Sequence, residues 1–574
     1  MLTSALLLAA AYPPMPFPFL IWIAWVPLLL LLDTLPDTGP DDPIWLRIRR
    51  PFILATRILS FAFLRHKDSW TIIENHEVSR TRKGFRYYFV TFLIWNLLTC
   101  YWLMLTALKV PTDEAFTSFL AGFIASILNP LFMSAPMLVW LKFHKRLPAF
   151  LSAILFMALW LSFEYLHLHW DLSWGWLSLG NSMSAAPQFI QFAEFTGSAG
   201  ISLWILSINL LIWGAIKSKG LLRWALPVLA MGIGLMPLGL NYWIMNPERD
   251  VFQPESYINV RIVQPNIDPY VKFDSEDLDR QLHTFYRLAG APGADSIQLV
   301  VFPETAIPEA VKTHEMSYNE SMKGFWTLAA QYPQMSILTG FTELRYFEQP
   351  PYPVTARPTN GGWYDYCNSA VILGSTRMRT YQKSLLVPMV ERVPFLDYLS
   401  GMQDYNIDIG GGFISYGVPD SVFNLYTRQD LPVGVMICYE SAFPDHARTY
   451  TRKGARLLAV ITNDGWWGQS AGYVQHAGLS VIRAIENRRA IVRSANTGIS
   501  VFIDEKGNRS QATPWWQETY IDSKVPVFNA RTFYVQHGEY LSKAMLWLSF
   551  IVCITALFYT PKSSISESSI PDTK

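Results

Sequence analysis

The sequence is poor in charge and in cysteine. Only 16% of its 574 residues are charged and the net charge is +1, so no general attraction to nucleic acid is expected. Four cysteines are too few for a disulfide scaffold. An H-E-x-x-H motif, paired C-x-x-C motifs and glycine-rich phosphate loops do not occur. We therefore expect no cofactor, no metal and no nucleic-acid partner.

Apolar sequence is what the chain has in excess. Hydrophobic residues make up 51% of it and aromatic residues 15%, which is more than an ordinary soluble domain contains. Long, nearly uncharged runs predict eight membrane spans: Met1–Ala11, Phe17–Leu32, Tyr87–Leu108, Ala115–Leu141, Leu147–Phe163, Gly200–Ile216, Leu221–Ile244 and Ala544–Thr560. Buried helices of a large soluble protein are the alternative, but so many long runs exceed the needs of one core.

The basic residues of the loops predict an orientation. Loop 33–86 is rich in Arg and Lys, and 142–146 and 217–219 are also basic, whereas the loops between them are not. The positive-inside rule places the basic loops and the N-terminus in the cytoplasm. We therefore predict a membrane domain at 1–244 with about seven spans, an extracytoplasmic domain at 245–540, a C-terminal span at 541–560 and a cytoplasmic tail at 561–574.

Residues 245–540 alternate short β-rich runs with helical patterns. The β-rich runs are 260–263, 298–302, 335–340, 369–373, 432–437, 457–462, 490–493 and 499–503. Helical patterns occupy 275–288 and 476–489. This alternation predicts an α/β domain in which helices cover sheets.

Three reactive side chains stand at the ends of such runs. One apolar strand pattern leads to Cys438, another leads to Glu304, and Lys383 stands just before a further apolar run. A thiol, an acid and a cation can form an acyl-transfer site, in which the acid is the general base and the cation stabilises the thiolate and the oxyanion. A packed, unreactive thiol is the alternative for a single cysteine. Cys367 could also pair with Cys438, which must stay reduced to act as a nucleophile.

Six short motifs carry a resemblance to a known family. They are Phe302-Pro-Glu-Thr305, Tyr381-Gln-Lys383, Glu391 before Val393-Pro-Phe395, Ile437-Cys-Tyr-Glu440, Thr462-Asn-Asp-Gly-Trp-Trp467 and Asn496-Thr-Gly-Ile-Ser500. In this order the chain resembles the carbon–nitrogen hydrolase (nitrilase) superfamily. With spans on both sides, it resembles the membrane-bound members that N-acylate bacterial apolipoproteins. The resemblance covers essentially the whole chain and implies a multi-span α-helical membrane domain plus an extracytoplasmic nitrilase-like αββα sandwich.

The resemblance also implies roles for individual residues. It makes Glu304, Lys383 and Cys438 the catalytic triad, with Glu391, Tyr439 and Glu440 as supporting residues. Phe273 stands where many members have Trp on a flap, and Trp466 and Trp467 either line an acyl pocket or pack. Several other polar residues are expected to be structural: Asn463 and Asp464 in a loop near the site, His476 at the surface, Glu486 paired with Arg488 or Arg489 along a helix, and Glu164 and Asp171 at the membrane interface.

The implied reaction moves an acyl chain from a phospholipid, through a cysteine thioester, to the α-amine of an S-diacylglyceryl-cysteine. Both substrates are lipids, and a diacylated lipid leaves the bilayer only at a cost of about 0.8 kcal/mol per CH₂ group. We therefore expect a monomeric enzyme of the bacterial inner membrane with its site on the periplasmic side. The alternative is a membrane-tethered amidase of the nitrilase type, which uses water instead of an amine.

Overall fold

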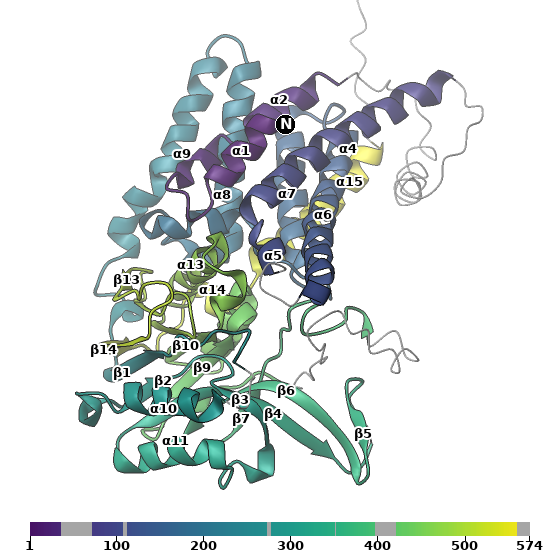
Figure 1. Cartoon of the computed structure of the whole chain (residues 1–574). Helices are drawn as coiled ribbons and strands as arrows, with labels where there is room; N and C mark the ends of the chain where they lie inside the picture. The colour runs from purple at the N-terminus through teal and green to yellow at the C-terminus, as the bar shows by residue number, and fades with distance from the viewer. Residues whose placement is uncertain (36–71, 107–111, 273–276, 351, 397–420, 559–574) are drawn as a thin grey trace, which may run out of the picture.

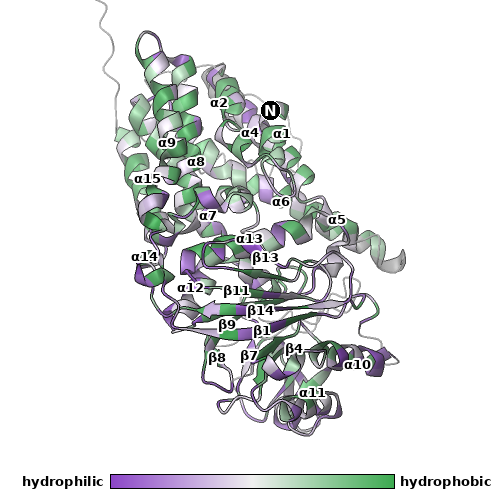
Figure 2. Ribbon diagram, turned by 90° about the vertical axis from the view of Figure 1, so that its left-hand side faces the viewer, coloured by the Kyte–Doolittle hydropathy of each residue, from purple (hydrophilic) through white to green (hydrophobic). Residues whose placement is uncertain are grey.

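The chain folds into a helical part and a sheet part that are stacked on each other (Figure 1). The computed structural model describes residues 1–35, 72–106, 112–272, 277–350, 352–396 and 421–558. We call α1 to α9 together with α15 the helical part, and β1 to α14 the sheet part. Figure 2 shows hydrophobic residues along the helical part, whereas the sheet part combines apolar strands with more hydrophilic helices and loops.

Five helices of the described chain are long and apolar enough to cross a membrane. The long helices of the helical part are α4 (Ile72–Thr99), α6 (Thr112–Phe143), α7 (Ala149–His167), α8 (Ala193–Lys217), α9 (Leu222–Ile244) and α15 (Tyr540–Phe558). All of these except α4 meet the criterion, α6 from Ser118 onward. The charged first half of α4 explains why it does not.

The first two predicted spans are shorter than a membrane crossing. Helix α1 (Leu2–Ala10) has nine residues, which is about 14 Å at 1.5 Å per residue, against a hydrocarbon core of about 30 Å. The second run divides into the 3₁₀ turn η1 (Pro18–Trp22) and α2 (Val26–Asp33), because its prolines interrupt a continuous helix. The third run lies in the end of α4 and in α5 (Trp102–Leu105). Residues 36–71 of the predicted basic loop and the predicted tail lie outside the described residues.

Two sheets form the centre of the sheet part. The strands of the first are β1 (Ser256–Gln264), β2 (Leu299–Val301), β3 (Ile307–Lys312), β4 (Ser336–Phe347), β5 (Arg357–Thr359), β6 (Gly362–Leu373), β7 (Thr380–Gln382) and β14 (Thr519–Val527). Those of the second are β8 (Leu425–Tyr426), β9 (Pro432–Ile437), β10 (Leu457–Thr462), β11 (Ile491–Ala495), β12 (Val501–Ile503) and β13 (Arg509–Ser510). The central strands of each sheet are parallel, since β1 pairs with β2 and β9 with β10 in the same direction.

Helices cover the outer face of each sheet. Alternate residues of the first sheet separate two cores: Val260 and Ile262 face the second sheet, whereas Val263 and Val300 pack with the two helices α10 (Leu278–Ala289) and α11 (Glu320–Gln331). The second sheet is covered by α12 (Pro444–Arg452) and α13 (Ala471–Asn487). The predicted αββα sandwich is therefore confirmed.

The sequence located most of these elements. The predicted strands 432–437 and 457–462 coincide with β9 and β10, and the two predicted helices are α10 and α13. The strands β3, β5, β7, β8, β13 and β14 and the helices α11 and α12 were missed. Most of these strands are too short to give a periodic pattern, whereas α11 does carry an apolar stripe, with Met322, Phe325 and Ala329 buried. Helix α13 lies at the boundary between the two parts (Figure 1), where it packs on α8 and on the 3₁₀ turn η3 (Leu179–Ala185).

Candidate active site

Cys438 stands at a sharp turn between a strand and a helix. It follows β9 directly and opens the 3₁₀ turn η10 (Cys438–Ala442). Its φ of +52° lies in the left-handed region, which non-glycine residues rarely adopt. Two hydrogen bonds hold its carbonyl oxygen, from Ser441 Oγ at 2.9 Å and from His476 Nε2 at 3.1 Å. This geometry is typical of a nucleophile that a strand presents at its carboxyl end.

Lys383 joins two carboxylates that come from distant parts of the chain. Its Nζ lies 3.2 Å from Glu304 Oε1 and 2.8 Å from Glu391 Oε1, and its side chain is 1% exposed. Asn368 donates to the same two oxygens, at 2.7 and 3.3 Å. Burial lowers the pKa of Lys383, but Glu304 and Glu391 raise it more, so the net pKa lies well above the usual value. The ammonium group therefore stays charged at neutral pH.

The thiol of Cys438 belongs to the same electrostatic group. Burial and the charge of Glu304 raise the pKa of Cys438, whereas Lys383 and a hydrogen bond with Thr462 lower it. The net pKa is raised, so the resting side chain is a neutral thiol that needs a base to become a nucleophile. Thr462 ends β10, the parallel neighbour of β9, which explains why both side chains reach the same edge of the sheet.

Glu440 ties the loop after the lysine to the strand before the thiol. Its side chain is fully buried and accepts hydrogen bonds from the Tyr381 hydroxyl at 2.6 Å, Ser384 N at 2.7 Å and Ile437 N at 2.7 Å. Burial raises the pKa of Glu440, but His446 and these hydrogen bonds lower it to a net value below the usual one. An ionised carboxylate therefore holds the two halves of the site together.

Tyr439 and Trp467 bring the site against the helical part. The Tyr439 hydroxyl donates to the Ser173 carbonyl at 2.6 Å, and its ring stacks 6.4 Å from that of Trp174. Trp467 packs 4.8 Å from Trp102, measured between ring centroids. Aromatic rings from both parts of the chain therefore meet next to the nucleophile. We call this contact, formed by Tyr439, Trp467, Trp102 and Trp174, the seam.

Trp466, another predicted substrate residue, contacts a residue of the sheet part. Trp466 packs 5.2 Å from Tyr270, which donates to the Trp466 carbonyl. Phe273 lies outside the described residues. Its neighbour Lys272, to which the sequence analysis gave no role of its own, is fully buried, and its Nζ donates to the Glu304 carbonyl and to Thr305 Oγ1, both at 2.8 Å. Burial lowers the pKa of Lys272 to about 7, although Glu304 raises it.

The structure corrects the expectation for His476. This side chain is fully buried, not at the surface. Its Nδ1 lies 2.9 Å from Asp464 Oδ1, which also pairs with Arg493. Asp464 therefore fixes the loop as expected, through two basic partners. The sequence did contain a signal for burial, because His476 lies on a helix with few polar residues. A buried imidazole on such a helix needs hydrogen-bond partners.

One further electrostatic expectation differs from the structure. Glu486 pairs with Arg483 and not with Arg488, which instead pairs with Glu194 of α8. Glu164, predicted at the membrane interface, is partly buried and accepts from Trp160 Nε1 and from the Leu179 backbone. The partner of Glu486 is three residues away on the same helix, whereas Glu194 and Leu179 belong to other elements than their partners Arg488 and Glu164.

The disulfide considered between Cys367 and Cys438 is not formed. All four cysteines are free. Among the described residues, no group of three or more His, Cys, Asp or Glu side chains is arranged to hold a metal ion.

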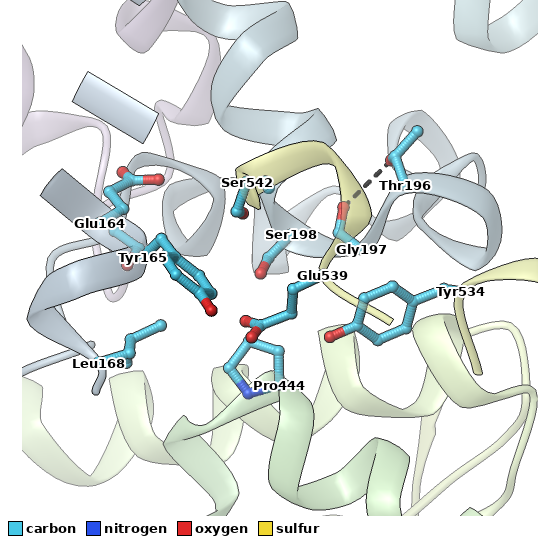
Figure 3. A pocket seen from close by; sticks show the side chains of 12 residues that line it. Glu164, Tyr165, Leu168, Thr196, Gly197, Ser198, Pro444, Tyr534, Glu539 and Ser542 are labelled. Carbon is cyan, nitrogen blue, oxygen red and sulfur yellow. Dashed lines mark hydrogen bonds between the residues drawn. The ribbon is translucent and has the colours of Figure 1, made fainter. Parts of the chain in front are cut away.

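A separate cavity of about 20 Å³ lies where the helical part meets α12 and α14 (Phe533–His537). Figure 3 shows Tyr165, Ser198, Tyr534 and Glu539 around it. None of the three predicted triad residues lines this cavity. The candidate active site is therefore defined by the ion group of Lys383, Glu304 and Glu391 together with the Cys438 thiol, and not by this cavity.

Comparison with known proteins identifies the family. Residues 259–532 match the carbon-nitrogen hydrolase family, and residues 56–211 match the apolipoprotein N-acyltransferase N-terminal domain. An apolipoprotein N-acyltransferase from Chlorobaculum tepidum is 30% identical over 97% of this chain and 95% of its own length. Another from Geobacter metallireducens is 26% identical over 93% and 90%. The solved structure of the C. elegans NitFhit protein covers 51% of this chain and 65% of its own, with 17% identity and a TM-score of 0.34. The chain belongs to the apolipoprotein N-acyltransferase family, and it is an acyltransferase whose sheet part is a carbon–nitrogen hydrolase domain.

Proposed function

We propose that this enzyme transfers an acyl chain from a phospholipid to the α-amine of the S-diacylglyceryl-cysteine of an apolipoprotein, through a thioester on Cys438. Family membership supports the reaction class. The observation that carries the residue assignment is the charged Lys383 between Glu304 and Glu391, in electrostatic contact with the Cys438 thiol. An amidase would need the same triad, but the match to the N-terminal domain of the acyltransferases favours acyl transfer.

In the first half-reaction Cys438 Sγ attacks the ester carbonyl carbon of the phospholipid. The thiol proton passes to Glu304, which acts as general base. The oxyanion that forms is stabilised by the Lys383 ammonium group and by the backbone N–H of Tyr439, the residue after the nucleophile. Glu304 then gives the proton to the departing lysophospholipid oxygen. The acyl chain remains on sulfur as a thioester.

In the second half-reaction the acceptor amine attacks the thioester carbonyl carbon. Glu304 takes a proton from the attacking nitrogen, and the C–S bond breaks. Lys383 stabilises the departing thiolate, which then recovers the proton from Glu304. The products are an amide on the apolipoprotein and the free Cys438 thiol, so the cycle closes without another reactant.

Glu391 positions Lys383 in this scheme. One of its oxygens holds the ammonium group, and the other accepts from the Val387 backbone at 2.8 Å. The carboxylate is therefore fixed from both sides. With Glu391 holding one side of the ammonium group, Lys383 stays charged while Glu304 gains and loses its proton.

The seam between the two parts is the entry for both lipids. Trp174, Trp467 and the ring of Tyr439 offer an apolar wall beside the nucleophile, and acyl chains favour such surfaces. The basic loops of the sequence support a site on the periplasmic side of the bacterial inner membrane. One chain holds every group that the cycle uses, which supports a monomer.

Intact-mass analysis tests this proposal. The purified protein is incubated in detergent with phosphatidylethanolamine, and peptide mapping locates any added acyl mass. We expect one acyl group on Cys438, released when a diacylglyceryl-peptide with a free α-amine is added. The variant Cys438→Ala keeps the ion group and serves as the control. An acyl group on another residue of the wild type, or release to water at the same rate without the peptide, would contradict the proposal.

A further inference from the structure

Gln475, on α13 of the sheet part, forms hydrogen bonds to the helical part with both its amide oxygen and its amide nitrogen. Its Oε1 accepts from Trp102 Nε1 at 3.1 Å and from Trp176 Nε1 at 2.8 Å. Its Nε2 donates to the Pro13 carbonyl at 2.8 Å and to the Thr99 carbonyl at 3.0 Å. A primary amide has two acceptor positions and two donors, so this side chain is fully used. All four partners belong to the helical part.

His476, the next residue of α13, instead contacts the turn that carries the nucleophile. Its Nε2 lies 3.1 Å from the Cys438 carbonyl oxygen and 3.0 Å from Ser441 Oγ. A carbonyl oxygen can only accept, so Nε2 carries a proton. The Nδ1 atom faces Asp464 and Arg493, which fixes the ring plane. The imidazole thus holds the backbone of the nucleophile from a rigid site.

The hydrogen bond from His476 restrains the peptide group between Cys438 and Tyr439, whose N–H stabilises the oxyanion in the proposed mechanism. Cys438 has a positive φ, a conformation that persists in non-glycine residues only where the surroundings enforce it. The peptide between Cys438 and Tyr439 is planar, and in a trans peptide its C=O and N–H point in opposite directions. Holding the carbonyl oxygen on one side therefore sets the direction of the Tyr439 N–H on the other.

We propose that Gln475 and His476 are positioning residues through which the helical part sets the Cys438–Tyr439 peptide for oxyanion stabilisation. The inference rests on the proposed function, since it assigns the Tyr439 N–H to the oxyanion. Adjacent residues on one helix carry the two contacts, so a movement of α13 away from Trp102 and Trp176 also moves the imidazole. The Cys438–Tyr439 peptide is therefore held in the orientation for oxyanion stabilisation only while α13 is packed on the helical part.

Two reactions of Cys438 distinguish a loss of peptide positioning from a general loss of folded structure. Acylation by p-nitrophenyl butyrate passes through an oxyanion, whereas alkylation by iodoacetamide does not. Both rates are measured on the full-length protein in detergent, with peptide mapping to confirm Cys438 as the reacting residue. In Gln475→Leu and His476→Asn we expect acylation to fall on the order of tenfold to a hundredfold, with alkylation changed much less. His476→Gln, whose amide can still donate to the Cys438 carbonyl, should keep most of the acylation rate.

Gln191 provides a matched control. It is also a buried glutamine that joins the two parts, since its Nε2 donates to the Lys506 carbonyl and its Oε1 accepts from Arg488 Nη1. Arg488 follows the far end of α13, about 20 Å along the helix from Gln475. Gln191→Leu should therefore disturb the contact between the parts without changing the ratio of acylation to alkylation.

Several outcomes would overturn the inference. One is an equal fall of both reactions in Gln475→Leu, and another is the same change of ratio in Gln191→Leu. If Gln475→Leu does not fold, Gln475→Glu takes its place, because its carboxylate still accepts from the two tryptophans but cannot donate to the two carbonyls. A wild type that accepts butyrate on Cys438 but no acyl group from phospholipid would refute the proposed function and leave this test intact.

Discussion

The substitution Glu440→Gln is expected to weaken both stability and catalysis. It replaces one carboxylate oxygen by an NH₂ group, which cannot accept from the backbone donors that Glu440 now satisfies. A hydrogen bond to a charged group contributes about 1.5–3 kcal/mol, and the Ile437 N–H would be left facing another donor. We therefore expect the free energy of unfolding to fall by about 2–3 kcal/mol. Because Ser384 follows Lys383 and Ile437 precedes Cys438, acylation should fall on the order of tenfold or more.

The effect on stability should depend on pH. The pKa of Glu440 is lower in the folded protein than its ordinary value of 4.5, so folding favours the ionised form. Its contribution is fully present above about pH 4.5 and is lost as the pH falls through the lower, folded-state value. The difference between wild type and Glu440→Gln should therefore be large at pH 7 and shrink in acid.

Thermal unfolding in detergent from about pH 3 to pH 8, together with the rate of Cys438 acylation, measures both effects. Glu194→Gln is the matched control, because Glu194 is a buried acid of α8 whose basic partner Arg488 directly follows α13 and is not one of the site residues. It should lose stability without a lower acylation rate of the folded protein. A wild-type acylation rate in Glu440→Gln, or a stability difference that grows as the pH falls, would refute the reasoning.

Three further substitutions test the site. Glu304→Gln removes the general base, so no acyl mass should appear on Cys438 after incubation with phospholipid; an acylated variant would contradict the assignment. Lys383→Met leaves two buried carboxylates without their cation, and loss of one partner of a buried pair typically costs about 3–5 kcal/mol; we expect a large drop in thermal stability, and a variant as stable as wild type would show that Lys383 is not the group that balances Glu304 and Glu391. Cys367→Ser should keep the wild-type acylation rate, because Cys367 is buried and free; loss of acylation would implicate a second thiol.

The local patterns of the sequence predicted membrane spans and an α/β domain, and they indicated Cys438, Glu304 and Lys383 as candidate reactive residues. Apolar runs of about twenty residues indicate membrane spans because the bilayer sets that length, and short apolar runs that end in reactive residues indicate parallel strands. The strands ending at Cys438 and near Glu304 are two such cases, and the structure has both as β9 and β2. The limits of local pattern appear in the first two runs, where prolines divide the helix and leave α1 and α2 too short to cross.

The sequence by itself determined which residues can react and which segments are apolar, because both depend on residue type and on neighbours along the chain. Only the tertiary structure decided the partners of the buried polar groups. Lys383 and Glu304 are 79 residues apart, and Gln475 and Pro13 are 462 apart. A buried amide or imidazole must find donors and acceptors wherever packing brings them, and no periodicity encodes that choice. For this reason His476 was expected at the surface and lies instead at the back of the nucleophile.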